Sequence, residues 1–368
     1  MKYYRTLLLA TPLLLLAGCN SSSNDSKSEA AATSKPLADH KFTDTERDEL
    51  LDERQQILES MRLVYQGQTY DQVSFAESFG EQMTLVKLST NNGSHSLDLL
   101  LQNGRETEPC VIYQNQTNFA TFRCDTATRS IGNDTTLIDS VTHVQNEAVR
   151  IEYYSEAEEY LGSVGSTVLT PAQSGNQMTI TTSFAFNEFY RDIFGNDGST
   201  ERINSTLGAT TYLQLNEIVQ NFSGSSMTMA FNNHIGGSAD DDINMYTGLL
   251  IHNQEMTTVV NATGSVFSGG TDLFAAGKLR ILNTADASQP IEASQQVGVH
   301  SWGQGDKTAK DFPYTDKSHR KQATYFNTVM GDKGIDFYLF TLDSAPANGE
   351  HWVTKSDSDK YIFINEIN

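Results

Sequence analysis

The sequence predicts an α/β protein in which an N-terminal helix and a small β-rich domain precede a C-terminal domain of alternating strands and helices. Three observations predict this. Residues 43–66 open with a capping pattern and carry apolar residues at helical spacing. Residues 67–172 consist of short, alternating, β-prone runs. From residue 173 to residue 368, strand-like segments alternate with helical ones, which is typical of βαβ units around a largely parallel sheet.

Local patterns justify each element in order. Thr43 followed by Glu46 resembles a capping box and predicts where the first helix begins. Residues 83–90 and 95–102 flank an Asn-Asn-Gly turn and predict a hairpin. The C-terminal half contains predicted strands at 178–186, 226–233, 257–267 and 295–302, and predicted helices at 210–222, 243–253, 271–279 and 319–331.

Composition limits the size and the partners of the protein. The 368 residues are enough for two moderate domains, and the 18 Phe and 15 Tyr residues recur at regular spacing, as in a folded chain. There are 25 Lys and Arg residues against 46 Asp and Glu, a formal net charge of −21. No Lys/Arg cluster offsets this charge locally, and an acidic surface repels phosphate backbones. We therefore expect no nucleic-acid partner.

The first residues predict the compartment. Lys2 and Arg5 precede an apolar run at residues 7–17, which has the length of a signal-peptide core and is too short for an ordinary transmembrane helix. The run ends in Leu-Ala-Gly before Cys19, which resembles the lipobox of bacterial lipoproteins. The resemblance implies that residues 1–18 are a signal peptide, and that Cys19 is lipidated with palmitate or a similar acyl chain. An uncleaved anchor and a simply secreted protein are the alternatives.

The lipoprotein resemblance also implies a location. Asn20, rather than Asp, follows the cysteine, which in lipoproteins favours the outer membrane. We expect a protein anchored in that membrane through its N-terminal lipid and facing the periplasm. Residues 19–42 are rich in Ser, Ala, Asn and Asp without apolar periodicity, and are predicted to be a flexible tether. Cleavage removes two basic residues and no acid, so the mature chain is more acidic still.

The remaining cysteines, Cys110 and Cys124, favour a disulfide, because an even pair in an oxidising compartment is usually bridged. The β-prone segment between them predicts a bridged hairpin inside the β-rich domain; two buried free thiols are the alternative. The eight histidines are scattered, with no HExxH or CxxC pattern, so we predict no metal and no cofactor. Nothing in the β-rich domain suggests catalysis, and binding or packing is its expected role.

Three segments of the C-terminal half place reactive groups at strand ends. The pair Gly236-Gly237 follows a strand and lets backbone N–H groups face an oxyanion. Ser268 stands at a strand-to-helix junction, where the helix dipole and the N–H of Gly269 favour an anion. His300 ends a strand, and its imidazole can act as a general base where it reaches a serine. Taken singly, these features also fit a turn, an N-cap serine and a structural histidine.

Together the three segments resemble the proteolytic subunit of Clp protease and its relatives in the ClpP/crotonase fold, especially periplasmic Clp-like proteins. The resemblance covers residues 173–368 and implies a βαβ spiral. The family's Asn-x-x-Gly-Gly pattern matches Asn233 to Gly237, its Gly-x-x-x-Ser followed by Ala-Gly matches Gly264, Ser268 and Ala276-Gly277, and its basic residue matches His300.

The resemblance also implies an acidic third member. The family has an acid two positions before a short aromatic-aliphatic-Thr strand, and Trp352 to Thr354 fits that strand. This places Glu350 at the acid position, where the family usually has Asp. Asp343, in the segment before it, is the competitor, and a Ser-His dyad without a fixed acid is also possible.

The implied activity is serine hydrolysis, most simply of peptides or proteins. Ser268 would attack a carbonyl carbon, His300 would take its proton, Glu350 would orient the imidazole, and N–H groups of Gly237 and Gly269 would hold the oxyanion. A Clp-like lipoprotein that is catalytically silent and acts as a binding or scaffold module is the main alternative. Acyl-thioester chemistry of the crotonase kind is disfavoured, because its cofactor is cytoplasmic. The family often forms rings, so an oligomer is possible.

Residues 240–242, an Asp-Asp-Asp run after the two glycines, have two interpretations. Acids in the first turn of a helix are stabilised by the helix dipole, which is a structural role. The other interpretation is a cation site or a filter that favours basic substrates. His234 and His319 lie near the proposed site segments, and neither is predicted to be catalytic.

Overall fold

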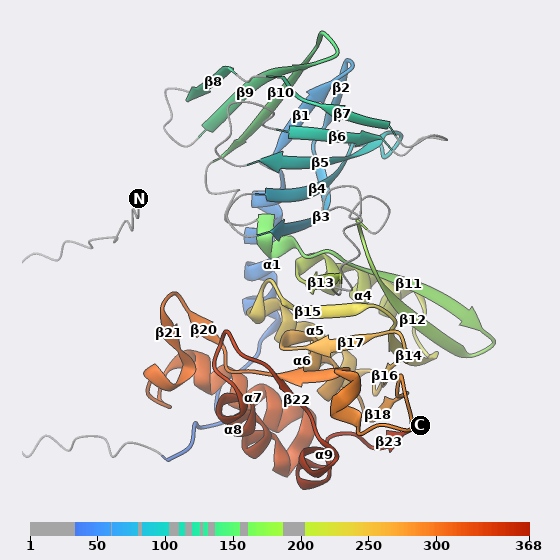
Figure 1. Ribbon diagram of the computed structural model, residues 1–368, viewed down its shortest axis with the longest axis vertical. Helices are drawn as coiled ribbons and strands as arrows, with labels where there is room; N and C mark the ends of the chain where they lie inside the picture. The colour runs from blue at the N-terminus through green and yellow to red at the C-terminus, as the bar shows by residue number, and fades with distance from the viewer. Residues whose placement is uncertain are drawn as a thin grey trace, which may run out of the picture.

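The structure is a computed structural model that describes residues 34–59, 61–79, 83–102, 110–114, 120–125, 128–131, 137–154, 161–186 and 203–368. The predicted signal peptide, Cys19 and the tether as far as residue 33 lie outside the described residues. Figure 1 shows the strands between Arg62 and Tyr154, labelled β1 to β10, stacked along the long axis of the molecule on the α/β part that carries the C-terminus. Among the described residues, no helix combines the length and the apolar character that crossing a membrane requires.

Two largely parallel sheets make up the α/β part. One sheet has the order β11 (Thr167–Ser174), β12 (Gln177–Phe184), β14 (Ser226–Phe231), β16 (Thr257–Val260), β18 (Leu279–Leu282) and β23 (Glu366–Ile367). The other has the order β13 (Asn204–Leu207), β15 (His234–Ser238), β17 (Ser265–Phe267), β19 (Val297–Val299) and β22 (His351–Trp352). The predicted α/β class is confirmed.

The chain builds these sheets from a repeated unit of two strands followed by one helix. One strand of each repeat joins each sheet, and the helix returns the chain to the start of the next repeat. The helices are α4 (Ala209–Asn221), α5 (Asp241–Asn253), α6 (Gly269–Ala275), α7 (Lys317–Met330), α8 (Gly334–Ser344) and α9 (Lys355–Tyr361). Short elements complete the part: η1 (Ile291–Ser294), η2 (Ala309–Asp311), η3 (Gly331–Lys333), and the β20–β21 hairpin (Gly303–Gln304 and Lys307–Thr308).

This repeat explains a difference from the sequence prediction. Residues 257–267 were expected to be one strand, but they form β16 in one sheet and β17 in the other. The chain bends between the two strands, where the N–H of Asn261 donates to the carbonyl of Phe231 at 3.1 Å. A Cβ atom on Gly264 would lie 2.1 Å from that same carbonyl oxygen, so only glycine allows the close crossing.

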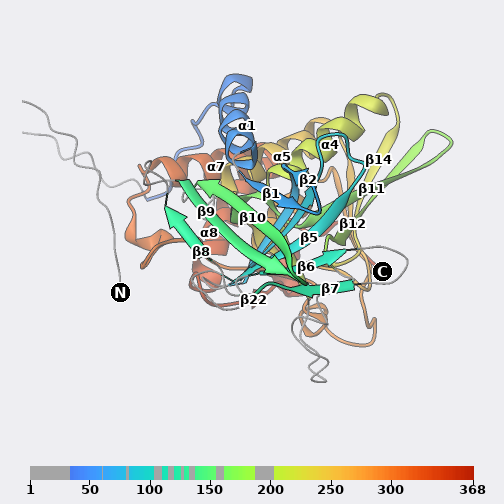
Figure 2. The same cartoon turned by 90° about the horizontal axis from the view of Figure 1, so that it is seen from above.

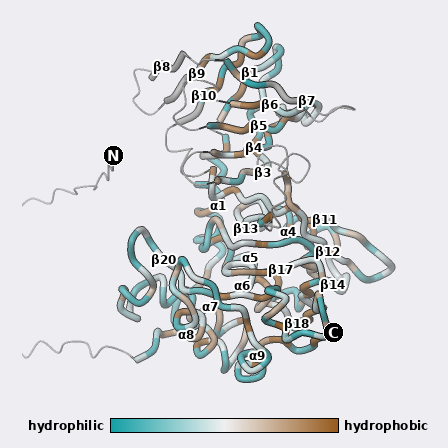
Figure 3. The backbone as a smooth tube through the Cα atoms, in the orientation of Figure 1, coloured by the Kyte–Doolittle hydropathy of each residue, from teal (hydrophilic) through white to brown (hydrophobic). Residues whose placement is uncertain are grey.

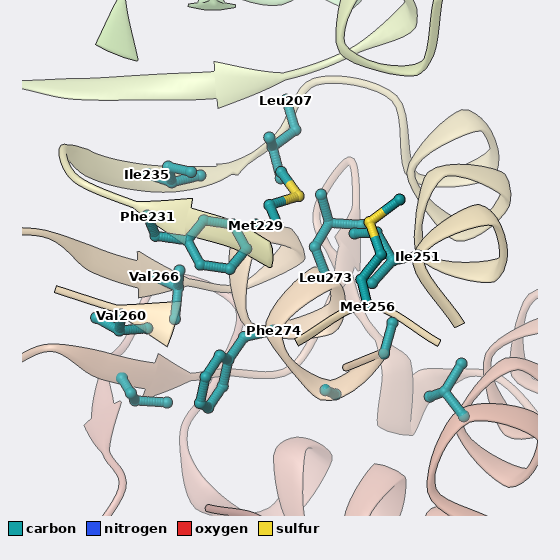
Figure 4. Packing of buried hydrophobic residues seen from close by; sticks show 14 of the residues in the cluster. Leu207, Met229, Phe231, Ile235, Ile251, Met256, Val260, Val266, Leu273 and Phe274 are labelled. Atoms are coloured by element: carbon teal, nitrogen blue, oxygen red, sulfur yellow. The ribbon is translucent and has the colours of Figure 1, made fainter. Parts of the chain in front are cut away.

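The core of the α/β part lies between the sheets and the helices. Figure 4 shows Phe231, Val266 and Phe274 packed together with side chains from neighbouring elements. The rings of Phe231 and Phe274 meet edge to face, with centroids 6.5 Å apart. Figure 3 shows hydrophobic residues along the strands, whereas the second half of β11 is exposed.

The β-rich part contains two antiparallel sheets that share one hydrophobic core. The first has the order β2 (Gln68–Tyr70), β1 (Arg62–Tyr65), β10 (Glu147–Tyr154), β9 (Leu137–Val144) and β8 (Thr128–Ile131). The second has the order β3 (Gln72–Phe79), β4 (Met83–Ser89), β5 (Ser96–Gln102), β6 (Cys110–Gln114) and β7 (Ala120–Arg123). The predicted hairpin is β4 and β5, in which Ser89 is opposite Ser96.

The predicted disulfide is confirmed. Cys110 and Cys124 are bonded, with Cα atoms 5.2 Å apart, and the N–H of Cys124 donates to the carbonyl of Cys110 at 2.9 Å. β6 and β7 pair antiparallel, so the bridge closes a hairpin at its open end. Both cysteines are buried in the core of the β-rich part.

The β-rich part contacts the α/β part through buried groups. The carboxylate of Glu77 in β3 accepts hydrogen bonds from the hydroxyls of Ser166 and Thr206, the latter at 2.9 Å. Phe75 and Phe184 lie in one apolar cluster that spans both parts. β11 begins at residue 167, ahead of the boundary expected at residue 172, because it already pairs with β12.

The N-terminal helix α1 (Asp44–Glu59) lies against the α/β part, near α5 and α7 (Figure 2). It ends before residue 66, the expected end, because Leu63 and Tyr65 enter the β-rich core on strand β1. Glu46 accepts hydrogen bonds from Tyr246 Oη at 2.9 Å and lies 3.2 Å from Lys321 Nζ. Arg54 Nε donates to Asp240 Oδ2 at 2.6 Å. The helix is therefore attached at both ends to the elements that surround the site described below.

We expect the contribution of Glu46 to stability to depend on pH. Partial burial alone would raise its pKa, but hydrogen bonds from Tyr246 and Lys321 and the charge of Lys321 outweigh it and lower the pKa of Glu46 to about 2. A depressed carboxyl pKa stabilises the folded state above the ordinary value of 4.5, and this stabilisation is lost as pH falls toward 2. Glu46→Gln should lower the free energy of unfolding by about 2 kcal/mol at pH 7 and by much less at pH 2.5.

Urea unfolding at the two pH values measures this difference. The matched control is Glu49→Gln on the same helix, which removes an exposed acid and should change stability little at either pH. An equal loss for Glu46→Gln at both pH values would contradict the assignment.

Candidate active site

Three neighbouring parallel strands carry the predicted site residues to one edge of a sheet. β15 pairs in parallel with β17, and β17 with β19. Gly237 lies near the end of β15, Ser268 directly follows β17, and His300 directly follows β19. The carboxyl ends of parallel strands point the same way, so residues far apart in sequence meet there.

Ser268 occupies a strained backbone conformation between β17 and α6. Its φ is 52° and its ψ is −122°, values that residues other than glycine rarely adopt. Such strain costs on the order of 1–3 kcal/mol and persists only where surrounding contacts hold it. The N–H of Ser268 donates to the carbonyl of Gly298 at 3.2 Å, and its own carbonyl accepts from the N–H of Thr271 at 2.8 Å. Thr271 Oγ1 donates to the same Gly298 carbonyl at 2.6 Å, which ties α6 to β19.

Ser268 and His300 are in direct contact. Ser268 Oγ lies 2.8 Å from His300 Nε2, and His300 Nδ1 lies 2.7 Å from the carbonyl oxygen of Ala347. A carbonyl only accepts hydrogen bonds, so the proton of the neutral ring belongs on Nδ1. Nε2 is then the acceptor for the hydroxyl of Ser268, which is the tautomer that a general base needs. The ring of Phe267 covers His300, with centroids 4.8 Å apart.

The partner of His300 Nδ1 differs from the sequence prediction. Glu350 was expected to orient the imidazole, but the Ala347 carbonyl stands at that nitrogen and Glu350 is exposed. The cause is the turn before β22, in which the N–H of Gly349 donates to the carbonyl of Pro346 at 2.9 Å. Asp343, the competitor, is also exposed and pairs with Lys310 at 2.8 Å. In the described part of the chain, therefore, a backbone dipole replaces the expected carboxylate.

The two predicted oxyanion glycines flank Ser268. A Cβ atom on Gly237 would lie 3.5 Å from Ser268 Cβ, so the backbone of Gly237 runs directly beside the serine. A Cβ atom on Gly269 would lie 2.8 Å from the backbone nitrogen of Ser238, so only glycine fits there. Gly269 is in the first turn of α6, where N–H groups have no acceptor within the helix.

The Asp run at residues 240–242 divides into different roles. Asp240 is the N-cap of α5 and pairs with Arg54, and Asp242 pairs with Lys321 at 2.8 Å. Asp241 accepts a hydrogen bond from the hydroxyl of Ser238 and lies near His300. Two of the three carboxylates therefore hold structure, and the middle one faces the site.

A small cavity adjoins Ser268 and His300. Its volume is about 40 Å³, and its walls include Asp241, Asp272, Trp302, Phe326 and Tyr338. A neighbouring cavity of about 230 Å³ shares Asp241, Trp302 and Gln322 with it. Ser268 therefore lies on the wall of a small cavity, beside a larger one that shares three of its wall residues.

Asp272 was missed by the sequence analysis. It lies four residues after Ser268, and burial, together with the charge of Asp241, raises its pKa well above the ordinary value. The pKa of Asp241 is raised too, first by desolvation of the carboxyl group, although the residue is partly open to solvent, and then by the charges of Asp240 and Asp242. The available signal was an acid inside the otherwise apolar segment that follows Ser268.

The other histidines near the site have partners of their own. His234 Nδ1 lies 2.8 Å from Ser265 Oγ, away from Ser268. His319 is buried, with Nδ1 2.7 Å from Tyr338 Oη and Nε2 2.9 Å from the carbonyl of Ala309. Among the residues that the structure describes, no group of three or more His, Cys, Asp or Glu side chains could hold a metal ion.

Comparisons with known proteins address the fold. No family model and no curated protein matches this chain. Similar solved structures include an enoyl-CoA hydratase from Shewanella pealeana, with 10% identity and a TM-score of 0.34 over 57% of this chain and 71% of that chain. A putative enoyl-CoA hydratase from Streptomyces avermitilis has 13% identity and a TM-score of 0.32, over 54% and 67%. DspI from Pseudomonas aeruginosa has 10% identity and a TM-score of 0.33, over 54% and 72%.

The C-terminal part has the predicted α/β architecture, in which helices alternate with the strands of two largely parallel sheets. Identities this low say nothing about activity, because one fold supports many chemistries. The function has to be argued from the site residues themselves.

We expect Thr271 to hold the nucleophile segment against β19. Thr271→Val keeps the shape of the side chain but leaves the buried Gly298 carbonyl without its hydroxyl donor, which should lower the free energy of unfolding by about 1–2 kcal/mol. Thr263→Val is the control, because that hydroxyl is exposed and donates to Asn232 at 3.2 Å. Urea unfolding of the two variants measures the effect, and equal stability would show that the Thr271 contact contributes nothing.

Proposed function

We propose that this protein is a serine hydrolase, most simply a peptidase, held by a lipid on the outer membrane and facing the periplasm. The observation that carries the proposal is the 2.8 Å contact between Ser268 Oγ and His300 Nε2, in the tautomer that the Ala347 carbonyl selects. The strained backbone of Ser268 supports it, because such strain is concentrated at functional sites. The lipid anchor rests on the sequence around Cys19 alone.

The chemistry follows from this geometry. Ser268 Oγ would attack the carbonyl carbon of a substrate while its proton moves to His300 Nε2. The carbonyl oxygen becomes an oxyanion, for which the N–H groups of Gly237 and Gly269 are the donors; losing one such donor costs roughly 10²–10³ in rate. The imidazolium then protonates the leaving group, the bond to that group breaks, and an acyl-enzyme remains. Water attacks this ester with His300 as base, which releases the acid and restores Ser268.

One observation favours the catalytically silent alternative. A carbonyl dipole at His300 Nδ1 orients the ring but stabilises an imidazolium less than a carboxylate would. A Clp-like binding or scaffold module would keep the same fold without needing that charge. The labelling experiment below separates the two functions.

We expect a fluorophosphonate probe to label the full-length chain at Ser268. Ser268→Ala should abolish labelling, and His300→Gln should slow it at least about 100-fold, because the base that activates the hydroxyl is removed. In-gel fluorescence with peptide mapping measures both effects. A wild-type chain that is not labelled, or equal labelling of Ser268→Ala, would support the silent module instead.

Two control variants make this experiment specific. Ser265→Ala removes a serine that also contacts a histidine, His234, but lies outside the cavity walls. Glu350→Gln removes the acid that sequence resemblance had favoured. Both should be labelled within about twofold of the wild-type rate. A large loss for Glu350→Gln would show that this acid reaches His300 in the working enzyme.

The lipid anchor makes a separate prediction. Cells that express the full-length chain should incorporate labelled palmitate into it, and Cys19→Ala should lose the label and leave the membrane fraction, because the acylated thiol is gone. Asn20→Asp is the control: it should remain acylated but shift toward the inner membrane. Palmitate on Cys19→Ala, or none on the wild-type chain, would overturn the anchor.

A further inference from the structure

The two cavities at the candidate site differ in size and share part of their walls. The cavity beside Ser268 has a volume of about 40 Å³, and its neighbour has a volume of about 230 Å³. A single water needs roughly 10–15 Å³ of cavity, so the small one holds little more than a reacting carbonyl group, whereas the larger one holds a side chain. Asp241, Trp302 and Gln322 line both cavities. A molecule bound at Ser268 can therefore extend past these residues into the larger cavity.

Gln322 differs from the other shared residues because it is both buried and unpaired. Only 9% of its surface is exposed. Across the residues that the structure describes, its side-chain amide has no hydrogen-bond partner, yet the amide is not sealed off from solvent as the unpaired oxygen of Asn244 is. The open space at Gln322 is that of the two cavities, so the amide faces them. A buried amide without a partner is costly unless a bound molecule completes its hydrogen bonds.

Helix α7 holds this amide at the site. Gln322 lies one turn before Phe326, and residues four apart share one face of a helix. Phe326 lines the cavity beside Ser268, so this face of α7 is directed at the site. On the same helix, Tyr325 Oη donates to the backbone carbonyl of Asp272 in α6 at 2.7 Å. The amide is therefore presented by a helix that is attached to the segment directly after Ser268.

The charged groups of the larger cavity favour an uncharged guest. Lys321 Nζ is 2.8 Å from Asp242 and 3.2 Å from Glu46, so its charge is already paired. The pKa of Asp241 is raised, first by desolvation, which favours its neutral form. An ion that left water for this cavity would gain little to offset its lost hydration. Met245 is apolar and buried on the same wall, and suits an alkyl stem.

We propose that Gln322 determines specificity, and that its amide binds a substrate side chain ending in a primary amide, as glutamine does. The inference deepens the proposed function and rests on it: the residue bound in the larger cavity supplies the carbonyl that Ser268 attacks. A primary amide both donates and accepts, so two of them pair through two hydrogen bonds. The stem of the bound side chain lies against Trp302 and Met245. A site of this kind rejects an analogue without the amide, because its own polar group is then left unpaired.

Peptidyl diphenyl phosphonates test this inference directly. Ser268 Oγ forms a bond to phosphorus, the bond to one phenoxide breaks, and the serine proton passes through His300 to that phenoxide, giving phenol. Three probes share one peptide and differ only in the side chain beside phosphorus: glutamine, homoleucine or glutamate. Homoleucine has methyl groups in place of the amide oxygen and nitrogen, so it keeps the shape and loses the hydrogen bonds. Glutamate keeps the shape and adds a negative charge.

We expect the wild-type full-length chain to react at least about tenfold faster with the glutamine probe than with the homoleucine probe. The glutamate probe should be no faster than homoleucine, because Lys321 is already paired. Gln322→Met keeps the length of the side chain without its donor and acceptor. This variant should bring the glutamine-to-homoleucine ratio to about one and keep the homoleucine rate within about threefold. Asn327→Leu is the control, because it removes an exposed amide from the same helix and should keep the wild-type ratio.

Each outcome has a distinct meaning. If homoleucine reacts as fast as glutamine with the wild-type chain, the inference is wrong, and this comparison depends on no variant. A glutamate probe that reacts faster than glutamine would identify Lys321 as the recognition group and overturn the inference. If Gln322→Met keeps the glutamine preference or slows both probes equally, Gln322 does not determine specificity. Failure of the plain fluorophosphonate, which has no such side chain, would instead overturn the hydrolase proposal.

Discussion

The parallel pairing of β15, β17 and β19 is the constraint on which the candidate site depends. Each strand ends at the same edge of the sheet, and each ending delivers one component: the Gly237 backbone, Ser268 and His300. The Gly298 carbonyl then joins two of these endings, because it accepts from both the N–H of Ser268 and the hydroxyl of Thr271. The serine thus keeps a positive φ because the next strand holds it there.

The charges around Ser268 and His300 differ from those of a Ser-His-acid triad in two respects. A backbone carbonyl, not a carboxylate, faces His300 Nδ1, so the ring is oriented by a dipole. Two acidic side chains, Asp241 and Asp272, nevertheless line the small cavity that Ser268 and His300 also border. The pKa values of both carboxyl groups are raised, which favours their neutral forms, so the site has little fixed charge to stabilise an imidazolium.

The N-terminal helix belongs to the surroundings of the site rather than to the tether. Glu46 contacts Tyr246 and Lys321, and Arg54 neutralises the N-cap of α5 one residue before Asp241. Without Arg54, Asp240 would add an unpaired charge next to the cavity. The helix therefore also shapes the electrostatics of the site, which its distance from Ser268 in the sequence does not suggest.

Local sequence determined several features of this protein. The turn residues and the alternation predicted the hairpin of β4 and β5, and the even pair of cysteines predicted the disulfide. The alternation of strands and helices predicted the α/β part. Each of these patterns depends on residues close in the chain or on simple pairing. The resemblance around Ser268 and His300 identified two residues that the structure brings into contact. The signal for lipidation at Cys19 is also purely local, and it remains a prediction.

Only the tertiary structure decided the rest. The single strand expected at residues 257–267 splits because Gly264 must pass the Phe231 carbonyl, a contact with another repeat. Ala347, and not Glu350, faces His300 because a turn sets the direction of one carbonyl, and a carbonyl leaves no trace in the side-chain sequence. Asp272 became noticeable only in the fold, which places its side chain on the wall of the cavity beside Ser268 and raises its pKa. Sequence patterns show which chemical groups are present. The burial and the hydrogen-bond partners of those groups set their pKa values and their contribution to stability, and both depend on segments that meet only in the fold.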